Sequence, residues 1–468
     1  MAEQTRYDLA VIGAGPGGYV AAARAAQLGM KVCCIDKFER PGGVCLNYGC
    51  IPSKALLDSS EHAFLAANRF KDHGISVGAP EVDLKAMMKR KDAVVQALTD
   101  NVANLLKAAN VDMIHGTATL ESAARVNVEN GSGNQRVEAE NILLATGSRP
   151  AALDGLAFDG RSIVTSTEAL AFDKVPGRLL IVGGGYIGLE LGSVWSRLGS
   201  RVTVVEMTDH IAGSMDSQLS RRLLRILKKQ GIDFKLKTRV TGAKVRKKTV
   251  KVAMDTEGEA SEQTCETVLV AVGRQPLTDG LGMADAGVRT DDRGFVIVDE
   301  NFRTNVENIH AIGDLIGGPM LAHKASAEGR AAAEIMAGGF GEVNYDAVPM
   351  VIYTHPEAAA AGKTEEQLKQ EGISYCTGTF PLTGAGRARC MGETEGMVKV
   401  LSNRKTDRVL GVHIIAPRAS DMIAEAVFAI EFGASAEDIG RIMHGHPTFA
   451  EALQESAMVA RQCSIYTG

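Results

Sequence analysis

Residues 7–18 read Tyr-Asp-Leu-Ala-Val-Ile-Gly-Ala-Gly-Pro-Gly-Gly, an apolar run that ends in a glycine-rich turn. An alanine-rich segment follows over residues 19–28, and residues 31–36 form a second apolar run that ends in Asp36. This order predicts a strand, a helix and a second strand, the βαβ unit that binds a dinucleotide.

The glycines of this turn have distinct expected roles. Gly13 allows the tight turn, Gly15 lets the backbone approach a pyrophosphate, and Gly18 lets the helix pack on the strand. The helix N-terminus offers N–H groups and a positive dipole end to the phosphates. Asp36 is expected to accept hydrogen bonds from a ribose. For a single copy, a glycine turn that only packs a helix on a sheet stays open as an alternative.

A second copy of the pattern lies further along the chain. A strand is expected over residues 179–182, a helix over 189–198 and a strand over 201–206. In both copies the acid follows the first glycine by 23 residues, so we infer an internal duplication of a nucleotide-binding unit. The residues that repeat the first set are Gly183, Gly185, Gly188 and Glu206.

Glu206 indicates which nucleotide the second copy binds. A carboxylate at this position pairs with a free 2′-hydroxyl and repels a 2′-phosphate. The second site is therefore expected to prefer NAD over NADP.

The composition is that of an ordinary globular protein. The chain has 468 residues, of which 45% are hydrophobic and 23% charged, so whole-chain disorder is excluded. The net charge of −5 disfavours a nucleic-acid or anionic-membrane partner. No apolar run approaches the ~20 residues of a membrane span, and no secretion signal is evident, so we expect a cytoplasmic location. A mature organelle protein trimmed of its leader stays open as the alternative.

The pattern predicts an α/β fold with two Rossmann-like dinucleotide-binding domains and a separate C-terminal α+β domain. Each βαβ unit closes with a strand, a glycine turn and a proline, near residues 150 and 276. After residue 348, residues 398–401 and 409–415 resemble antiparallel strands, with helices expected at about 418–433 and 448–462. The expected parts are a first dinucleotide domain (1–150), a second (151–276), a segment with a third strand-turn and a helix (277–347) and the C-terminal α+β domain (348–468).

Residues 42–54 hold a candidate redox centre. They read Gly-Gly-Val-Cys-Leu-Asn-Tyr-Gly-Cys-Ile-Pro-Ser-Lys, with Cys45 and Cys50 separated by four residues. Gly43 and Gly49 could supply bends that let the sulfurs meet. A zinc site is the rival interpretation, but no second Cys/His pair with ligand spacing accompanies them, and we expect no metal. Inert buried thiols are the other alternative, whereas a small local disulfide in a cytoplasmic chain favours redox catalysis.

Together these motifs resemble the flavin-dependent pyridine nucleotide-disulfide oxidoreductases, and within them the branch that oxidises dihydrolipoyl groups with NAD. The resemblance covers essentially the whole chain. Further segments that carry it are Ala311–Asp314, Met320–Lys324, Tyr353–Glu357 and His444–Thr448. It implies that the first βαβ unit binds FAD and the second NAD; the glycine turn of each unit, with the helix N-terminus that follows it, is called a cradle below. It also implies that residues 277–347 complete the FAD site and that residues 348–468 form a dimerisation domain.

The resemblance also implies roles for individual residues. Cys45 would exchange with the substrate disulfide, Cys50 would lie against the flavin, and Lys54 would lie beside the reactive flavin nitrogen, paired with Glu190. Asp314 would hold the ribityl chain. Further contacts to FAD would come from Lys37, Gly43, Gly116, Gly147, Met320, Leu321, Ala322 and His323. Further positions near NAD would be Ile187, Val240, Gly273 and Arg274.

Thiol–disulfide exchange needs a base, since a free thiol near neutral pH is mostly protonated. Histidine titrates in the required range, and the resemblance supports His446 as the base with Glu451 as its partner. Thr448 and Glu451 also have the spacing of a capping box for the last helix. The resemblance further implies a cis peptide bond between His446 and Pro447, although only about 5–6% of X-Pro bonds are cis.

The implied assembly is a homodimer in which His446 and Glu451 act across the subunit interface. The implied partners are lipoyl domains and the acyltransferase core of 2-oxo acid dehydrogenase complexes, or the glycine cleavage system.

Sister enzymes that act on glutathione or mercuric ion are close rivals. Glu206 argues against the former, and the lack of a C-terminal cysteine pair argues against the latter. A protein that only holds flavin is a rival of another class, which intact Cys45 and His446 disfavour.

Overall fold

The computed structural model describes residues 6–131 and 133–465, and the chain divides into two compact units. The first unit is built from three segments, Met1–Ala55, Lys85–Ala151 and Gly273–Val343. The second unit is built from the other three, Leu56–Leu84, Ala152–Val272 and Asn344–Gly468. The architecture is mixed α/β, with a Rossmann-like sheet in each unit and an additional α+β region at the C-terminus, as the sequence predicts.

The first unit is centred on a seven-stranded sheet with the order β3-β2-β1-β6-β5-β4, in which β17 also pairs with β6. The pairs formed by β1, β2, β3 and β17 are parallel, whereas β4, β5 and β6 are antiparallel neighbours. The strands are β1 (Arg6–Ile12), β2 (Val32–Asp36), β3 (Asp112–His115), β4 (Thr117–Ser122), β5 (Arg125–Asn130), β6 (Gly133–Leu144) and β17 (Ile309–Ala311).

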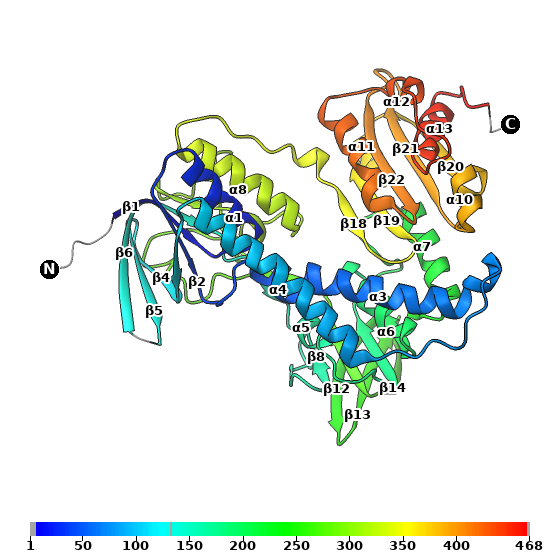
Figure 1. Ribbon diagram of the computed structural model, residues 1–468, viewed down its shortest axis with the longest axis horizontal. Helices are drawn as coiled ribbons and strands as arrows, with labels where there is room; N and C mark the ends of the chain where they lie inside the picture. Colours follow the sequence, from blue (N-terminus) through cyan, green and yellow to red (C-terminus); the bar gives the residue numbers. More distant parts are fainter. Residues whose placement is uncertain (1–5, 132, 466–468) are drawn as a thin grey trace. The chain divides into compact units, whose positions relative to one another are not determined.

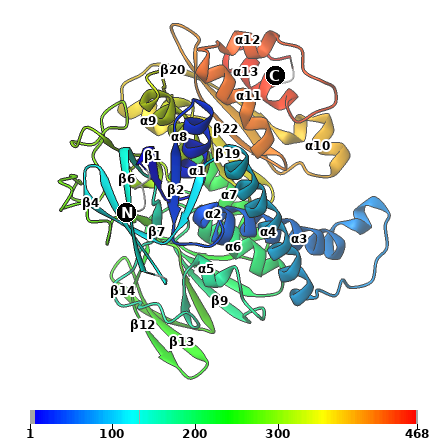
Figure 2. The same ribbon diagram turned by 60° about the vertical axis from the view of Figure 1, so that its left-hand side comes forward.

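Helices α1 (Pro16–Gln27) and α8 (Ala322–Met336) lie side by side in this unit (Figures 1 and 2). Their contact is close because both helices carry small residues there, and a Cβ on Gly329 would clash with the backbone of Gly17. The unit also contains α2 (Gly43–Tyr48), α4 (Leu84–Ala108), which enters it at Lys85, and the antiparallel pair β7 (Ser148–Pro150) and β16 (Arg274–Pro276). Helix α3 (Cys50–Asn68) begins in the first unit and ends in the second.

The second unit repeats the strand-helix-strand order of the first. Its parallel sheet has five strands in the order β11-β10-β9-β15-β8. Its strands are β8 (Ile163–Val164), β9 (Arg178–Val182), β10 (Arg201–Val205), β11 (Asp233–Lys235) and β15 (Thr267–Val270). Its helices are α5 (Ser166–Ala169), α6 (Tyr186–Arg197) and α7 (Ser217–Lys229). An antiparallel three-stranded sheet is attached to it (Figure 2), formed by β12 (Thr238–Arg246), β13 (Thr249–Thr256) and β14 (Glu259–Cys265).

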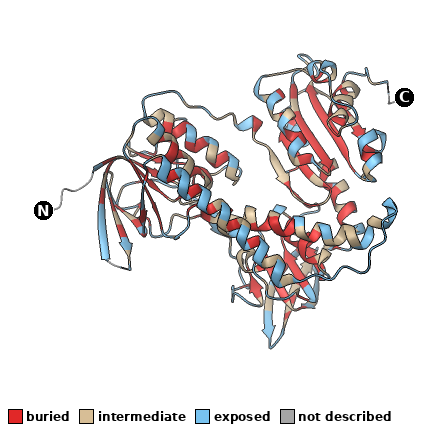
Figure 3. Ribbon diagram, viewed as in Figure 1, coloured by how far each residue is buried: buried red, intermediate tan, exposed pale blue. Residues whose placement is uncertain are grey.

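The C-terminal part of the second unit is an antiparallel sheet with the order β18-β19-β22-β21-β20. Strands β21 and β22 are buried along nearly their whole length (Figure 3), as their valine and isoleucine content favours. The strands are β18 (Met350–Ile352), β19 (Glu357–Gly362), β20 (Tyr375–Pro381), β21 (Met397–Asn403) and β22 (Val409–Ala416). The helices are α9 (Glu365–Gln370), α10 (Gly386–Met391), α11 (Ala419–Glu431), α12 (Ala436–Arg441) and α13 (Glu451–Ala460).

The predicted strands are present, but the helices of both βαβ units begin about one turn earlier than predicted. Helix α1 begins at Pro16 and α6 at Tyr186, inside the glycine turns. Proline suits the first helical position because the N–H that it lacks has no partner there in any helix. Within the described ranges, no helix is both long and apolar enough to cross a membrane.

Candidate functional site

The first glycine turn connects β1 to α1. Gly13 has a φ of +105°, and a Cβ there would clash with the backbone oxygen of Ala145. Gly15 is the N-cap of α1, and Pro16 follows at the first helical position. The N-terminus of α1 thus faces the turn without a capping side chain, which suits the binding of a phosphate.

Asp36 lies at the end of β2 and is buried. Its carboxylate accepts hydrogen bonds from the backbone N–H of Ala14 at 2.6 Å and of Phe38 at 2.8 Å. Burial raises the pKa of Asp36, while these two N–H donors and the charge of Lys37 act in the opposite direction. The acid is thereby fixed at the edge of the first turn, where the sequence predicts a ribose contact.

The second turn has the same construction. Gly183 has a φ of +108°, and a Cβ there would clash with the backbone oxygen of Ala271. Gly185 is the N-cap of α6, and a Cβ on it would meet no atom within 4 Å, so the space above it is open to a ligand. Ile187 lies in the first turn of α6 and is half-buried.

Glu206 follows β10 and takes the place of Asp36 in the second copy. One carboxylate oxygen accepts from the N–H of Gly184 at 2.7 Å, and the other accepts from the N–H and hydroxyl of Thr208 at 2.8 and 3.0 Å. Both copies therefore use an acid at the end of the second strand to hold the second residue of the glycine turn.

The cysteine segment packs directly on the first cradle. The N–H of Gly42 donates to the oxygen of Ala14 at 2.7 Å. A Cβ on Gly43 would lie only 2.7 Å from the Cα of Gly15, so glycine is needed for this approach. The segment that carries the cysteines is thus fixed against the turn that the sequence assigns to a dinucleotide.

Cys45 lies in α2, and Cys50 is the first residue of α3. Their side chains are hydrogen-bonded to each other. This hydrogen bond, together with burial, raises the pKa of Cys45, while the positive charge of Lys54 acts to lower it. Cys45 therefore keeps its proton longer than an ordinary cysteine does, and its exchange chemistry calls for a base.

Asp314 belongs to a polar cluster in the first unit. Its carboxylate accepts a short hydrogen bond from the hydroxyl of Ser148. The guanidinium of Arg274 donates to the hydroxyl and to the backbone oxygen of Ser148, both at 2.7 Å, and lies 3.9 Å from Asp314. The side chain of Arg274, which the resemblance places near NAD, thus contacts the residues around Asp314.

The remaining predicted cofactor positions lie at turns and element ends. Gly116 follows β3, and Gly147 and Gly273 precede β7 and β16. Residues 320–323 include the N-cap and first helical residues of α8, and Val240 is buried in β12. Glu190 is buried in α6, where its carboxylate accepts from the N–H of Tyr353 at 3.0 Å. The predicted pairing of Glu190 with Lys54 stays a prediction.

His446 and Glu451 are joined by a hydrogen bond of 2.8 Å between Nδ1 and Oε1. The other oxygen of Glu451 accepts from the N–H of Thr448 at 2.8 Å. Burial acts to raise the pKa of Glu451, but the bonds from His446 and Thr448 outweigh it and lower the pKa. The His446–Pro447 peptide bond is cis, which confirms the prediction, and so is His355–Pro356.

The predicted capping box at the last helix is only half formed. Glu451 accepts from the Thr448 N–H, but the Thr448 hydroxyl donates to the oxygen of Gly445 at 2.7 Å instead of accepting from the helix. The reason is that α13 starts at Glu451 itself, with Ala450 as its N-cap. Glu451 is therefore available to orient His446.

Sequence reasoning missed several polar residues beside the predicted ones, namely Ser148, Lys324, Glu328 and His355. Ser148 directly follows Gly147, and Lys324 ends the Met320–Lys324 motif. Lys324 and Glu328 are four residues apart, a spacing that places them on the same side of a helix. That spacing is the signal that could have identified this pair.

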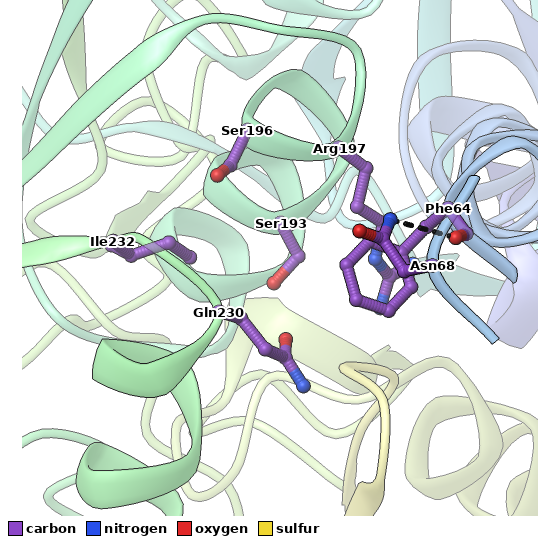
Figure 4. Close-up of a pocket in the computed structure, with 7 residues that line it drawn as sticks. All are labelled: Phe64, Asn68, Ser193, Ser196, Arg197, Gln230 and Ile232. Atoms are coloured by element: carbon purple, nitrogen blue, oxygen red, sulfur yellow. Dashed lines mark hydrogen bonds between the residues drawn. The ribbon is translucent and has the colours of Figure 1, made fainter. Parts of the chain in front are cut away.

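A pocket of about 210 Å³ lies in the second unit at the C-terminal ends of α3, α6 and α7 (Figure 4). It is lined by Phe64, Asn68, Ser193, Ser196, Arg197, Gln230 and Ile232. Arg197 is the one charged side chain of these seven, and among the described residues its Nη2 has no partner. Helix C-termini favour cations, whereas Arg197 favours anions, so the lining selects neither. None of the predicted site residues lines this pocket.

Comparisons with known proteins place these features in context. Residues 7–329 match the family described as pyridine nucleotide-disulphide oxidoreductase, and residues 348–457 match its dimerisation domain. Dihydrolipoyl dehydrogenase 1, mitochondrial, of Arabidopsis thaliana is 49% identical over 462 residues, which are 98% of this chain and 91% of the relative. The mitochondrial dihydrolipoyl dehydrogenase of Homo sapiens is 47% identical over 460 residues, which are 97% and 90% of the two chains.

Solved structures show the same relationship. LpdA from Mycobacterium tuberculosis has a TM-score of 0.89 at 27% identity, covering 97% of this chain and 99% of that one. The HOCl-induced flavoprotein disulfide reductase RclA from Escherichia coli has a TM-score of 0.85 at 28% identity, covering 97% and 100%. Because the matches span nearly the whole chain and its cysteine pair lies on a nucleotide cradle, this chain belongs to the pyridine nucleotide-disulphide oxidoreductase family.

Proposed function

We propose that this protein is a dihydrolipoyl dehydrogenase, which oxidises dihydrolipoyl groups at Cys45 and Cys50 and reduces NAD. The observation that carries the proposal is a pair of hydrogen-bonded thiols on a segment that packs against the first cradle. A dithiol substrate suits a two-cysteine centre because disulfides form and break by exchange between sulfurs. The curated relatives described above carry this activity in their names.

FAD in the first cradle and NAD in the second fit the residues present. A Cβ would clash at Gly13 and Gly18 in the first turn and at Gly183 and Gly188 in the second. Each turn leads into a helix N-terminus without a capping side chain. When bound, FAD supplies the two-electron transfer between the cysteine pair and NAD, and the protein supplies placement.

The residues proposed to hold the two cofactors are those that the resemblance implies. For FAD they are Gly13, Gly15, Gly18, Asp36, Lys37, Gly43, Lys54, Gly116, Gly147, Asp314 and residues 320–323. For NAD they are Gly183, Gly185, Ile187, Gly188, Glu206, Val240, Gly273 and Arg274, while Glu190 is proposed as the partner of Lys54 beside the flavin. The fixed carboxylates of Asp36 and Glu206 support their assignment to the two riboses.

The exchange at the cysteine pair proceeds in two steps. His446 accepts the proton of the first substrate thiol, the resulting thiolate attacks the Cys45 sulfur of the oxidised pair, and Cys50 leaves as a thiolate. The second substrate thiol then attacks the substrate sulfur of the mixed disulfide and displaces Cys45; the departing Cys45 sulfur takes the proton held by His446, and His446 accepts that of the second thiol. The substrate leaves as a cyclic disulfide, and both cysteines are left reduced.

His446 is the proposed base of both steps. Its Nδ1 is bonded to Glu451, which leaves Nε2 for the substrate thiol. The lowered pKa of Glu451 keeps a carboxylate beside the ring, and this stabilises the imidazolium that forms. The His446 side chain is 78% exposed in the single chain, so it is accessible to a second subunit.

The proposed assembly is a homodimer in which each site combines Cys45 and Cys50 of one subunit with His446 and Glu451 of the other. The chain carries the dimerisation domain of the family. In α11 and just beyond it, Phe428 and Phe432 are 64% and 73% exposed, an apolar surface that suits an interface. Lipoyl domains of 2-oxo acid dehydrogenase complexes or of glycine cleavage are the proposed partners.

We further propose that the chain is organised as an FAD domain (1–150), an NAD domain (151–276), a segment that completes the FAD site (277–347) and an interface domain (348–468). The cytoplasmic location inferred from the sequence stays a prediction, and the relatives described above are named as mitochondrial proteins.

The proposal is tested by the electron donor that the purified protein accepts. Wild-type protein should form NADH from dihydrolipoamide and NAD. It should turn over neither glutathione disulfide nor mercuric ion with NADPH at a comparable rate. Cys45→Ser should retain bound FAD and lose dihydrolipoamide turnover. Equal turnover by Cys45→Ser would show that the cysteine pair is not the centre.

A further inference from the structure

A fully buried ion pair in α8 has no part in the proposed chemistry. Nζ of Lys324 lies 2.8 Å from Oε1 of Glu328, and the two side chains are 2% and 0% exposed. Buried ion pairs are often no more stabilising than well-packed apolar residues of similar size, because both charges must be desolvated. Stability alone therefore does not account for this pair.

The further contacts of the pair converge on one residue. Oε2 of Glu328 accepts from the N–H of Gly313 at 2.7 Å, and Nζ of Lys324 donates to the oxygen of Gly313 at 3.3 Å. The two peptide groups that flank Gly313 are thus each held by one member of the pair. Gly313 has a φ of +74°, which other residues rarely adopt, so its conformation needs such support.

Gly313 begins the short 3-10 turn Gly313–Leu315, which follows β17 and contains Asp314. The peptide group between Gly313 and Asp314 is the one whose oxygen Lys324 contacts. Rotation of this group would move the Asp314 side chain away from Ser148. The pair therefore fixes the direction of the Asp314 carboxylate.

The helix that carries the pair is itself firmly placed. Helix α8 contacts α1 so closely that a Cβ on Gly329 would clash with the backbone of Gly17 (Figure 1). Helix α1 begins at the first cradle. A rigid connection thus runs from the cradle through α1 and α8 to the Asp314 turn, entirely within the first unit.

We infer that Lys324 and Glu328 are positioning residues for FAD, which hold the two peptide groups that flank Gly313 so that the Asp314 carboxylate faces the flavin ribityl chain. This inference rests on the proposed contact between Asp314 and FAD. The ion pair between Lys324 and Glu328 then serves to retain FAD rather than to stabilise the fold.

Two uncharged double variants separate these roles. In Lys324→Met/Glu328→Met, the N–H of Gly313 loses its acceptor. In Lys324→Met/Glu328→Gln, the amide oxygen of Gln can still accept from that N–H. Both avoid the lone buried charge that a single substitution would leave and that could prevent folding. The readout is the rate at which the purified holoenzyme releases FAD, followed by flavin fluorescence.

FAD release should be at least about tenfold faster in the Met/Met variant than in the Met/Gln variant, because an unsatisfied buried N–H carries a penalty of that size. Arg24→Met/Glu334→Met removes an ion pair that joins α1 to α8 by a 2.7 Å contact, and it should leave FAD release near the wild-type rate. Asp314→Asn should speed FAD release and so tests the underlying contact separately. Equal FAD release by the Met/Met and Met/Gln variants would overturn the inference, whatever the outcome with dihydrolipoamide.

Discussion

Glu206 is the residue whose surroundings most directly predict a specificity. Three hydrogen bonds from Gly184 and Thr208 fix its carboxylate beside the second cradle. Turnover with NAD should greatly exceed turnover with NADP, because the fixed charge repels a 2′-phosphate. Glu206→Ala should narrow the ratio of the two kcat/KM values by about tenfold or more. Asp209→Ala, at an exposed neighbouring acid, should leave the ratio unchanged, and equal efficiency of the wild type with both nucleotides would contradict the argument.

A site residue could be predicted from the sequence when the residues that define its role lie close to it along the chain. The glycines and acids of both cradles lie within one βαβ unit each, so spacing alone identified them. Ser148 meets Arg274 across 126 residues and Asp314 across 166 residues, and no local pattern specifies such contacts. The cluster around Asp314 therefore became visible only in the folded chain.

At the scale of elements, two glycines of one turn should respond differently to the same substitution. A Cβ on Gly188 would clash with the backbone oxygen of Gly183, so Gly188→Ala should destabilise the protein by about 1–3 kcal/mol. A Cβ on Gly185 would meet no atom within 4 Å, so Gly185→Ala should fold normally but raise the KM for NAD. Thermal unfolding and NAD titration measure the two effects. A normal KM in Gly185→Ala would show that NAD does not approach this turn.

His355 contacts two other segments of the second unit through a half-buried network. Its ring nitrogens lie 2.9 Å from Glu61 in α3 and 3.2 Å from Glu393, which follows α10. Burial acts to lower the pKa of His355, but the carboxylates of Glu393 and Glu61 outweigh it and raise the pKa to about 9. The same contacts lower the pKa of Glu61 against the effect of its burial.

This raised pKa predicts how stability changes with pH. Below a pH of about 6.5, His355 is protonated in both the folded and the unfolded chain, and its stabilisation is fully present. Between about 6.5 and about 9 the unfolded chain loses the proton first, so up to about 3 kcal/mol of stability is lost. The free energy of unfolding should therefore fall more steeply over this range in the wild type than in His355→Gln. If the free energy of unfolding falls equally with pH in the two proteins, the contacts of His355 do not contribute this pH-dependent stability.

Most helices and strands could be predicted, because apolar periodicity and the glycines that end an element are visible within a few residues of sequence. Both βαβ units and the antiparallel strands β21 and β22 lie where the sequence predicts them. The hairpins of β12, β13 and β14 were not anticipated, since β12 and β14 have few buried positions and so show little alternation of apolar and polar residues. The start of α13 was misplaced because the spacing of Thr448 and Glu451 is that of a capping box, whereas Glu451 bonds to His446.

At the scale of the whole molecule, the proposed shared site predicts complementation between two inactive proteins. Homodimers of Cys45→Ser and of His446→Gln should both be nearly inactive with dihydrolipoamide. In a mixed dimer, one site combines both substitutions and the other has an intact pair. Co-expressed mixed dimers should regain about half of the wild-type activity per dimer.

The control for this experiment is a mixture of each variant with a protein that carries both substitutions, which should restore nothing. If the site were built within one chain, mixing Cys45→Ser with His446→Gln would also restore nothing. That result would refute the shared site and leave the cysteine chemistry standing.

The sequence segments that make up each compact unit were the hardest feature to predict. Each unit is assembled from three separate segments of the sequence. The duplication is visible as a repeat, but segments such as Gly273–Val343 return to a unit begun more than two hundred residues earlier. Which segment returns to which unit is decided by tertiary packing, for example by the pairing of β17 with β6.

The acids that hold the glycine turns have a consequence for how quickly cofactors arrive. Asp36 bonds the N–H of Ala14, and Glu206 bonds the N–H of Gly184, so each turn is already shaped before a nucleotide enters. A carboxylate has lone pairs left for ribose hydroxyls while it keeps this bond. Encounter then needs no loop to become ordered, so association is limited by diffusion and orientation. The lifetime of the complex, rather than the speed of its formation, is what substitutions around the two turns will change.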